Sequence, residues 1–288
     1  NSIKKHLNSG KIVVVAGFQG VNEAGDVTTL GRGGSDTSAV ALAAALEGKC
    51  EIYTDVDGIY SIDPRVYSDA KKLPFISYDE MMELAYLGAG VMEPRAVELG
   101  GKYGVEIYVG KSLGEKNGTI ITSIEKIKEN KNMEQKVITG VSINENTIMV
   151  NVEEIPTNAQ NVSEIFEKAE KSGINIDMIS QNDVSSHHGS FAFTCPKTDM
   201  AALEKIEKEI EEKYEKTSFI VNPYVTKVSI VGIGLISNVG VASKMFKILA
   251  ENDISFHQIS TSEISISLIV DEVMGKKVAE LFAKEFDL

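Results

Sequence analysis

Residues 28–36 read T-T-L-G-R-G-G-S-D; they follow an apolar run at residues 12–16 and precede an alanine-rich segment. This order predicts a strand, a glycine-rich loop and a helix. The glycines let the backbone approach a ligand closely, and Arg32 offers a planar set of donors that suits a carboxylate or a phosphate. Ser35 and Asp36 are good helix N-cap residues, and the free N–H groups at a helix start attract anions. A glycine-rich turn alone is more often structural, but Arg32 close to Asp36 favours an anion site.

A second polar block follows the predicted helix. Residues 53–65 read Y-T-D-V-D-G-I-Y-S-I-D-P-R and begin in a β-rich segment at residues 50–54. The block suits a nucleotide, because Tyr60 can lie against a base, an aspartate can hold a hydroxyl or the water shell of a metal ion, and Arg65 can reach phosphate oxygens. A solvated acidic loop with a D-P turn is the simpler interpretation from composition alone.

Together with G-F-Q-G at residues 17–20, the two blocks resemble the substrate and ATP sites of the aspartate kinases, a family of the amino-acid kinase superfamily. The resemblance extends over essentially the whole chain. It implies that Arg32 binds the α-carboxylate of the amino-acid substrate, that Gly33, Gly34 and Ser35 help to hold it, and that Asp36 orients the catalytic lysine. The ATP pocket that it implies is lined by Thr54, Asp55, Tyr60, Ser61, Ile62, Asp63, Pro64, Arg65 and Gly90.

The chain departs from the family pattern in two places. The family reads G-A-K-V where residues 88–91 read G-A-G-V, so Gly90 stands at the position of a lysine near the phosphates. Either the backbone alone contacts the nucleotide there, or Arg95 or another cation supplies the charge. The second departure is that nothing matches the K-F-G-G loop with which the family begins, so we interpret the chain as the C-terminal portion of a longer enzyme. Because phosphoryl transfer depends on positioning and charge stabilisation, the chain alone is expected to be inactive.

Residues 1–123 are predicted to form the α/β part of the chain. A capping box at residues 77–80 starts one helix, a second helix covers residues 95–103, and strands cover residues 105–109 and 118–122. This alternation predicts a mainly parallel sheet covered by helices. Residues 124–136 are rich in Lys, Glu and Asn, which is typical of a solvated linker.

Beyond the linker the sequence repeats itself at an offset of 80 residues, as in the pairs Phe166 and Phe246 or Ile179 and Ile259. Each copy predicts the order strand, helix, strand, strand, helix, which is a split β-α-β ferredoxin-like plan, over residues 137–219 and 220–288. The predicted elements are 147–152, 162–172, 174–180, 190–195 and 201–214 in the first copy, and 227–231, 241–252, 254–260, 265–270 and 275–286 in the second. The copies resemble the paired ACT domains of the aspartate kinases, which implies that the strand at residues 137–143 joins the second copy.

ACT domains bind amino acids where a loop meets a helix, so the resemblance implies two sets of effector residues. They are Thr157, Asn175, Ile176, Asp177 and Gln181 in the first copy, and Ser237, Asn238, Gly240, Val241 and Ala242 in the second. Asp177 is a candidate partner for the ammonium group of an effector. The first loop reads T-N-A-Q instead of the frequent D-K-P-G, which leaves the effector, lysine, threonine or both, undecided. His187 and His188 have no further ligands at suitable spacing, so no metal site is predicted there.

Composition limits the partners and the compartment. The net charge of −13 over 288 residues argues against nucleic acid and anionic membranes, and no apolar run is long enough to span a bilayer. Two cysteines without a disulfide pattern favour a reducing, cytoplasmic setting. ACT pairing across a two-fold axis favours a homodimer or a higher homo-oligomer.

The sequence thus predicts an aspartate kinase that uses ATP with Mg²⁺ to phosphorylate the β-carboxylate of L-aspartate, with feedback by lysine or threonine. Two alternatives remain open. One is a non-catalytic, amino-acid-binding regulatory subunit of such a kinase, which the missing lysine loop favours and the retained Arg32 and Asp36 disfavour. The other is a kinase for glutamate or acetylglutamate, which the paired ACT domains disfavour.

Overall fold

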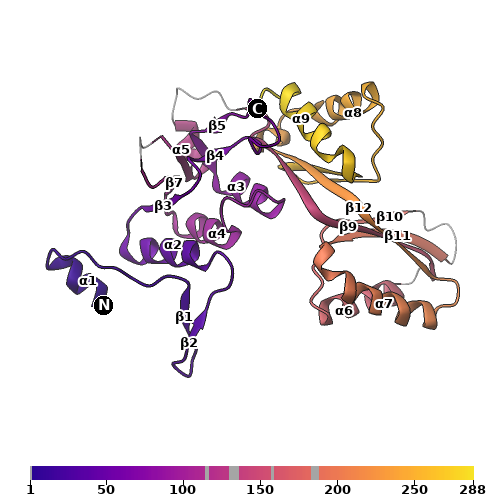
Figure 1. Cartoon of the computed structure of the whole chain (residues 1–288), viewed down its shortest axis with the longest axis horizontal. Helices are drawn as coiled ribbons and strands as arrows, with labels where there is room; N and C mark the ends of the chain where they lie inside the picture. The colour runs from indigo at the N-terminus through magenta and orange to yellow at the C-terminus, as the bar shows by residue number, and fades with distance from the viewer. Residues whose placement is uncertain (1, 114–116, 130–135, 157–158, 183–187) are drawn as a thin grey trace.

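The computed structural model describes residues 2–113, 117–129, 136–156, 159–182 and 188–288. An α/β part is followed by two ferredoxin-like units, which share one sheet (Figure 1). The predicted fold class is confirmed, and the sheet of the α/β part is mainly parallel, with one antiparallel pair. In this sheet, ordered β3-β7-β8-β6, the pairs β3–β7 and β6–β8 are parallel and the pair β7–β8 is antiparallel.

The elements of the α/β part have the following bounds. Its strands are β1 (Gln19–Val21), β2 (Val27–Thr29), β3 (Cys50–Thr54), β4 (Ile59–Tyr60), β5 (Lys72–Leu73), β6 (Phe75–Ser77), β7 (Ile107–Lys111) and β8 (Thr119–Thr122). Its helices are α1 (Ser2–Asn8), α2 (Gly34–Leu46), α3 (Tyr78–Tyr86), α4 (Pro94–Tyr103) and α5 (Ile124–Glu129). Half of the predicted linker is thus the helix α5, which packs against β6.

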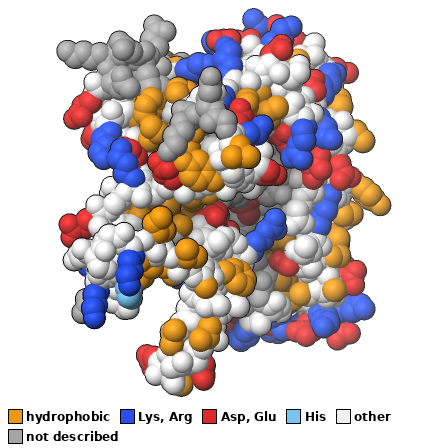
Figure 2. Space-filling model, turned by 60° about the vertical axis from the view of Figure 1, so that its left-hand side comes forward, with side chains coloured by type: hydrophobic (Ala, Val, Ile, Leu, Met, Phe, Trp, Pro, Cys, Tyr) orange, Lys and Arg blue, Asp and Glu red, His pale blue; other side chains and the backbone are white. Residues whose placement is uncertain are grey.

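The predicted strand at residues 12–16 is wrong. These residues have no regular structure, and the side chains of Ile12 and Val14 are 94% and 93% exposed. A strand needs a hydrogen-bonding neighbour, and among the described residues this run pairs with none of the strands. The chain continues into the β1–β2 hairpin, which projects from the α/β part as an arm with acidic residues at its tip (Figure 2).

Two long strands, β9 (Gly140–Pro156) and β12 (Ser218–Val231), run through both ferredoxin-like units (Figure 1). The first unit adds α6 (Ala159–Lys171), β10 (Ile179–Asn182), β11 (His188–Cys195), the 3₁₀ helix η1 (Lys197–Asp199) and α7 (Met200–Lys213). The second unit adds η2 (Ile233–Ile236), α8 (Val241–Glu251), β13 (Gln258–Thr261), β14 (Ser265–Asp271), η3 (Glu272–Met274) and α9 (Gly275–Glu285). The six-stranded sheet is ordered β10-β11-β9-β12-β14-β13, and the register of β9 with β12 shifts between Asn222 and Lys227, where one unit gives way to the other.

The strand predicted at residues 137–143 lies in the second unit, where Val141 pairs with Ile230. Two other predicted strands, 174–180 and 254–260, begin later than predicted, at Ile179 and Gln258. In each case the chain first leaves a helix end, and its backbone bonds to the sheet start at Asp177, which donates to the Thr194 carbonyl at 3.0 Å, and at His257, which donates to the Ile269 carbonyl at 2.8 Å.

The two cysteines lie in buried strands of different parts and are free thiols. Burial raises the pKa of the Cys50 thiol to about 11 and that of Cys195 to about 12. Both thiols are therefore protonated at neutral pH and serve as small apolar core residues. Among the described residues, no helix combines the length and the apolar character that crossing a bilayer requires.

Candidate functional site

The first polar block forms the start of α2. Gly33 is the N-cap and adopts the left-handed conformation with φ 68°, whereas Ser35 and Asp36 lie in the first turn. The predicted N-cap role of Ser35 and Asp36 is therefore wrong. Glycine reaches this conformation without a side-chain penalty, so the N-cap lies two residues before Ser35. The anion site at this helix start stays a prediction: Ser35 is exposed there, whereas the backbone N–H groups of Gly34 and Asp36 donate to the carbonyls of Gly31 and Gly33 at 3.2 and 3.1 Å.

Asp36 is half-buried and contacts the start of α4. Its carboxylate accepts hydrogen bonds from the Ser35 hydroxyl at 3.5 Å and from the backbone N–H of Glu93, the N-cap of α4. Burial outweighs these bonds and raises the pKa of Asp36 above its ordinary value of 3.8. A desolvated carboxylate in the first turn of a helix, four positions after an exposed arginine, has the character of a functional group rather than a structural one.

Replacing Asp36 by Asn should make the chain more stable at pH 7. A raised pKa means that the folded state holds the proton more tightly than the unfolded chain, so ionisation of Asp36 removes stability as the pH rises above 3.8. The gain should shrink as the pH falls towards that value. Urea unfolding of both proteins at pH 7 and pH 4 measures this, and a variant that is less stable at pH 7 would contradict it.

Arg32 and Arg95 are the two exposed cations near this helix start. Arg32 is exposed and forms no ion pair with any described residue, which leaves its guanidinium available to a ligand. Arg95 lies in the first turn of α4 and lines a pocket of 420 Å³ between α2 and α4, together with Thr37 and Ser38. Gly90 lies exposed in the loop before α4, with open space around its Cα.

The second polar block, after β3, is organised by a lysine that the sequence does not single out. The ammonium of Lys72, in β5, lies 3.2 Å from Asp57, and the Tyr60 hydroxyl lies 3.2 Å from the same carboxylate. Burial works to raise the pKa of Asp57, but the bonds and charge of Lys72 and the bond from Tyr60 outweigh it and lower that pKa. Lys72 is therefore a further cation at the predicted nucleotide site. What identifies Lys72 is its pairing with Tyr60 across β4 and β5, and this pairing exists only in the folded chain.

The other members of the block divide between the surface and the interior. Thr54 donates to Asp55 at 2.9 Å, and Arg65 pairs with Asp63 at 2.6 Å at the exposed end of the loop that includes Pro64. Ser61 and Ile62 are buried instead. The carbonyl of Ser61 accepts from Val141 of β9 at 2.7 Å, and Ile62 belongs to the core of the second unit. The resemblance assigns both residues to the ATP pocket, but the Ser61 carbonyl and the Ile62 side chain form the joint between the α/β part and the second unit, and the Ser61 hydroxyl accepts the backbone N–H of Lys71 at 3.1 Å.

The two sets of predicted effector residues lie in different units. In the first unit Asn175 and Gln181 are exposed, Ile176 packs on the core, and Asp177 pairs with Lys227 of β12; Thr157 lies outside the described residues. In the second unit Ser237, Asn238 and Gly240 lie exposed before α8, with Ala242 half-buried, whereas Val241 is a core residue. The structure does not bring the two sets together within one chain. Lys227, the partner of Asp177, is a residue of the first set's surroundings that no pattern in the sequence indicates.

The α/β part with its glycine-capped helix, followed by two units that share a sheet, defines the class of amino-acid kinases with an ACT regulatory region. The model of the amino acid kinase family matches residues 1–111, and an ACT domain model matches residues 228–286. The aspartokinase of Bacillus sp. (strain MGA3) is 44% identical over 288 residues, which cover 99% of this chain and 69% of the relative. The chain belongs to the aspartate kinase family.

Solved structures of the family have the same fold. The aspartate kinase of Clostridium acetobutylicum matches with a TM-score of 0.81 and 26% identity, over 94% of this chain and 62% of that one. Escherichia coli aspartokinase III in complex with aspartate and ADP matches with a TM-score of 0.77 and 25% identity, over 94% and 60%. The same enzyme in complex with lysine and aspartate matches with a TM-score of 0.71 at 25% identity, over 94% and 59%. This chain thus spans about two thirds of the length of its relatives.

Proposed function

We propose that this chain forms part of an enzyme that phosphorylates the β-carboxylate of L-aspartate with Mg-ATP. The observation that carries the proposal is the start of α2, where Arg32 is exposed and without an ion pair among the described residues, four positions before the half-buried carboxylate of Asp36. Arg32 would bind the α-carboxylate of aspartate through two parallel hydrogen bonds. Gly33, Gly34 and Ser35 would bring the backbone close to the substrate. The complex of E. coli aspartokinase III with aspartate and ADP supports this choice of substrates.

In the proposed reaction a β-carboxylate oxygen of aspartate bonds to the γ-phosphorus of ATP. The bond between that phosphorus and its bridging oxygen breaks, and ADP leaves with the electron pair. No proton needs to move, because the attacking carboxylate is ionised at neutral pH. The residues of the chain would position the reactants and offset the negative charge, which is most of what phosphoryl transfer needs. The candidate cations for the phosphates are Lys72, Arg65 and Arg95. Tyr60 would lie against the base, and Asp55 and Asp63 would hold a ribose hydroxyl or the water shell of Mg²⁺.

We further propose that lysine, threonine or both regulate the enzyme through the ferredoxin-like units, as the lysine complex of the E. coli enzyme suggests. Asn175 and Gln181 would contact an effector in the first unit, and Ser237, Asn238 and the free N–H groups at the start of α8 in the second. The enzyme would act in the cytoplasm as a homodimer or higher homo-oligomer that pairs through these units.

Arg32 and Arg65, two of the three arginines of the sequence, provide the test. Arg32→Ala should weaken aspartate binding about 10- to 100-fold, as expected for the loss of a charged, two-point hydrogen bond, and Arg32→Lys should restore part of it. Arg65→Ala should weaken the binding of ADP and leave the affinity for aspartate unchanged. Calorimetric titration of each protein with aspartate and with ADP gives both affinities. Arg32→Ala with wild-type aspartate affinity, or a wild-type chain that binds no aspartate, would contradict the proposal.

A further inference from the structure

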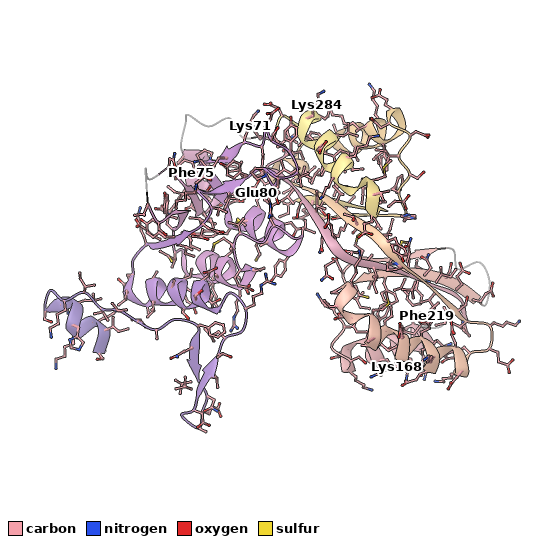
Figure 3. All side chains as sticks on the ribbon, in the orientation of Figure 1. Lys71, Phe75, Glu80, Lys168, Phe219 and Lys284 are labelled. Atoms are coloured by element: carbon pink, nitrogen blue, oxygen red, sulfur yellow. The ribbon has the colours of Figure 1, made fainter. Side chains whose placement is uncertain are left out.

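Glu80 is a buried carboxylate that belongs to two parts of the molecule at once. Its side chain is 4% exposed and lies where α3 meets the long strands (Figure 3). One oxygen completes the capping box of α3 with the backbone N–H and the hydroxyl of Ser77, at 3.3 and 2.6 Å. The other accepts the Thr139 hydroxyl at 2.6 Å and the backbone N–H of Ile233 at 3.1 Å. All four of these groups are neutral donors, so a single acceptor joins the helix to the second unit.

Further contacts hold α3 against the second unit along its length. Glu83, one turn after Glu80, accepts the hydroxyl of Ser265 in β14 at 2.6 Å. Beyond the end of the helix, Ser142 of β9 donates to the carbonyl of Leu87 at 2.8 Å. Gly88 then passes so close to Ile143 that a side chain would meet its carbonyl oxygen at 2.9 Å. The orientation of α3 is therefore set by the second unit.

The α3 helix leads directly to the candidate substrate site. Six residues, 87–92, connect its end to Glu93, whose backbone N–H bonds Asp36 and whose side chain packs against Gly33. On its other side, Glu80 holds Ile233, the first residue of η2, and η2 ends just before Ser237 and Asn238. Glu80 thus lies between the candidate effector loop of the second unit and the helix start that carries Arg32 and Asp36.

We propose that Glu80 is a positioning residue that transmits the state of the loop at residues 232–240 to the start of α2. The effector role of that loop rests on the proposed function, whereas the connection itself is a property of the folded chain. The chemistry requires a carboxylate, because four donors converge on two oxygens and an amide would turn its own N–H₂ towards one pair of them. Glu80→Gln therefore breaks one side of the connection with almost no change of shape.

The ligand-free chain tests the connection by hydrogen–deuterium exchange, read by mass spectrometry. Glu80→Gln should speed exchange at least tenfold at residues 231–238, 87–93 and 33–38, and leave α6 and α7 at the wild-type rate.

Glu83→Gln is the matched control, because the amide oxygen can still accept the hydroxyl of Ser265. Thr139→Val removes one donor, keeps the capping box and should have an intermediate effect, which keeps the test open if Glu80→Gln folds poorly. Wild-type exchange at 87–93 and 33–38 in Thr139→Val and Glu80→Gln would reduce Glu80 to a local structural role and overturn the proposal.

A second series adds lysine or threonine. If either binds the wild-type chain, exchange at residues 33–38 should change on binding, and this response should be lost in Glu80→Gln while the calorimetric affinity stays within threefold. A response that survives in Glu80→Gln would overturn the proposal. If neither amino acid binds, the proposed regulation fails, and the ligand-free series still decides the role of Glu80.

Discussion

Asp177→Asn is expected to lower the free energy of unfolding by about 3 kcal/mol, whereas Lys227→Met should change it by less than about 1 kcal/mol. The two side chains form an ion pair between the first unit and β12. Lys227 is 3% exposed and Asp177 is 45% exposed. Removing the carboxylate leaves a buried ammonium without a counter-charge. Removing the ammonium leaves a half-exposed carboxylate that water can solvate, and Met fills the space of the lysine stem.

Urea unfolding followed by circular dichroism measures both variants. Glu251→Gln is a suitable control, because it removes an ion pair with Lys247 whose side chains are 62% and 74% exposed, and it should change stability by less than about 1 kcal/mol. Equal losses of unfolding free energy in Asp177→Asn and Lys227→Met would mean that the pair matters only as a contact.

The ion pair also bears on the proposed regulation, since an effector whose ammonium group binds Asp177 must first displace Lys227.

Patterns that are local in the sequence predicted the structure well. The capping box at Ser77 and Glu80 needs only residues three apart, and β3 needs only a β-rich run before a turn, so both were found with their bounds. The run at residues 12–16 is equally apolar, yet it forms no strand, because a strand depends on a neighbour that periodicity does not reveal. The N-cap of α2 moved to Gly33 because glycine can adopt a backbone conformation that Ser35 would strain to reach.

The candidate site was predicted where a motif is contiguous and missed where the fold brings distant residues together. Arg32 and Asp36 follow from one short stretch. Lys72 reaches Asp57 across a hairpin, and Lys227 reaches Asp177 over 50 residues, so neither appears in a pattern of spacing. Glu80 was found as a helix cap, but its second partners, Thr139 and Ile233, lie 59 and 153 residues away. Polar contacts between residues that are distant in the chain therefore cannot be predicted from the spacing of residues in one sequence.

Gly33→Ala is expected to abolish detectable aspartate binding, which is the largest effect on the proposed site. Gly33 has φ 68°, a conformation that a side chain destabilises by about 1 to 2 kcal/mol. A Cβ atom would also lie 2.5 Å from the Glu93 carboxylate and 2.6 Å from the Glu93 Cβ. The N-cap of α4 must therefore move away, and the backbone bond from Glu93 to Asp36 breaks with it. Arg32 and Asp36 then lose the geometry in which they would hold the substrate.

Gly31→Ala separates the strain from the clash. Gly31 also has a positive φ, 81°, but a Cβ atom there would meet nothing within 4 Å. This variant should lose a similar amount of backbone stability and keep aspartate affinity within about fivefold, since a misplaced contact and not strain alone is what disrupts a binding site. Titration with aspartate, together with urea unfolding, compares the two. If both variants bind aspartate equally well, the contact between Gly33 and Glu93 does not position the site; if both lose binding, the loop conformation matters more than the contact.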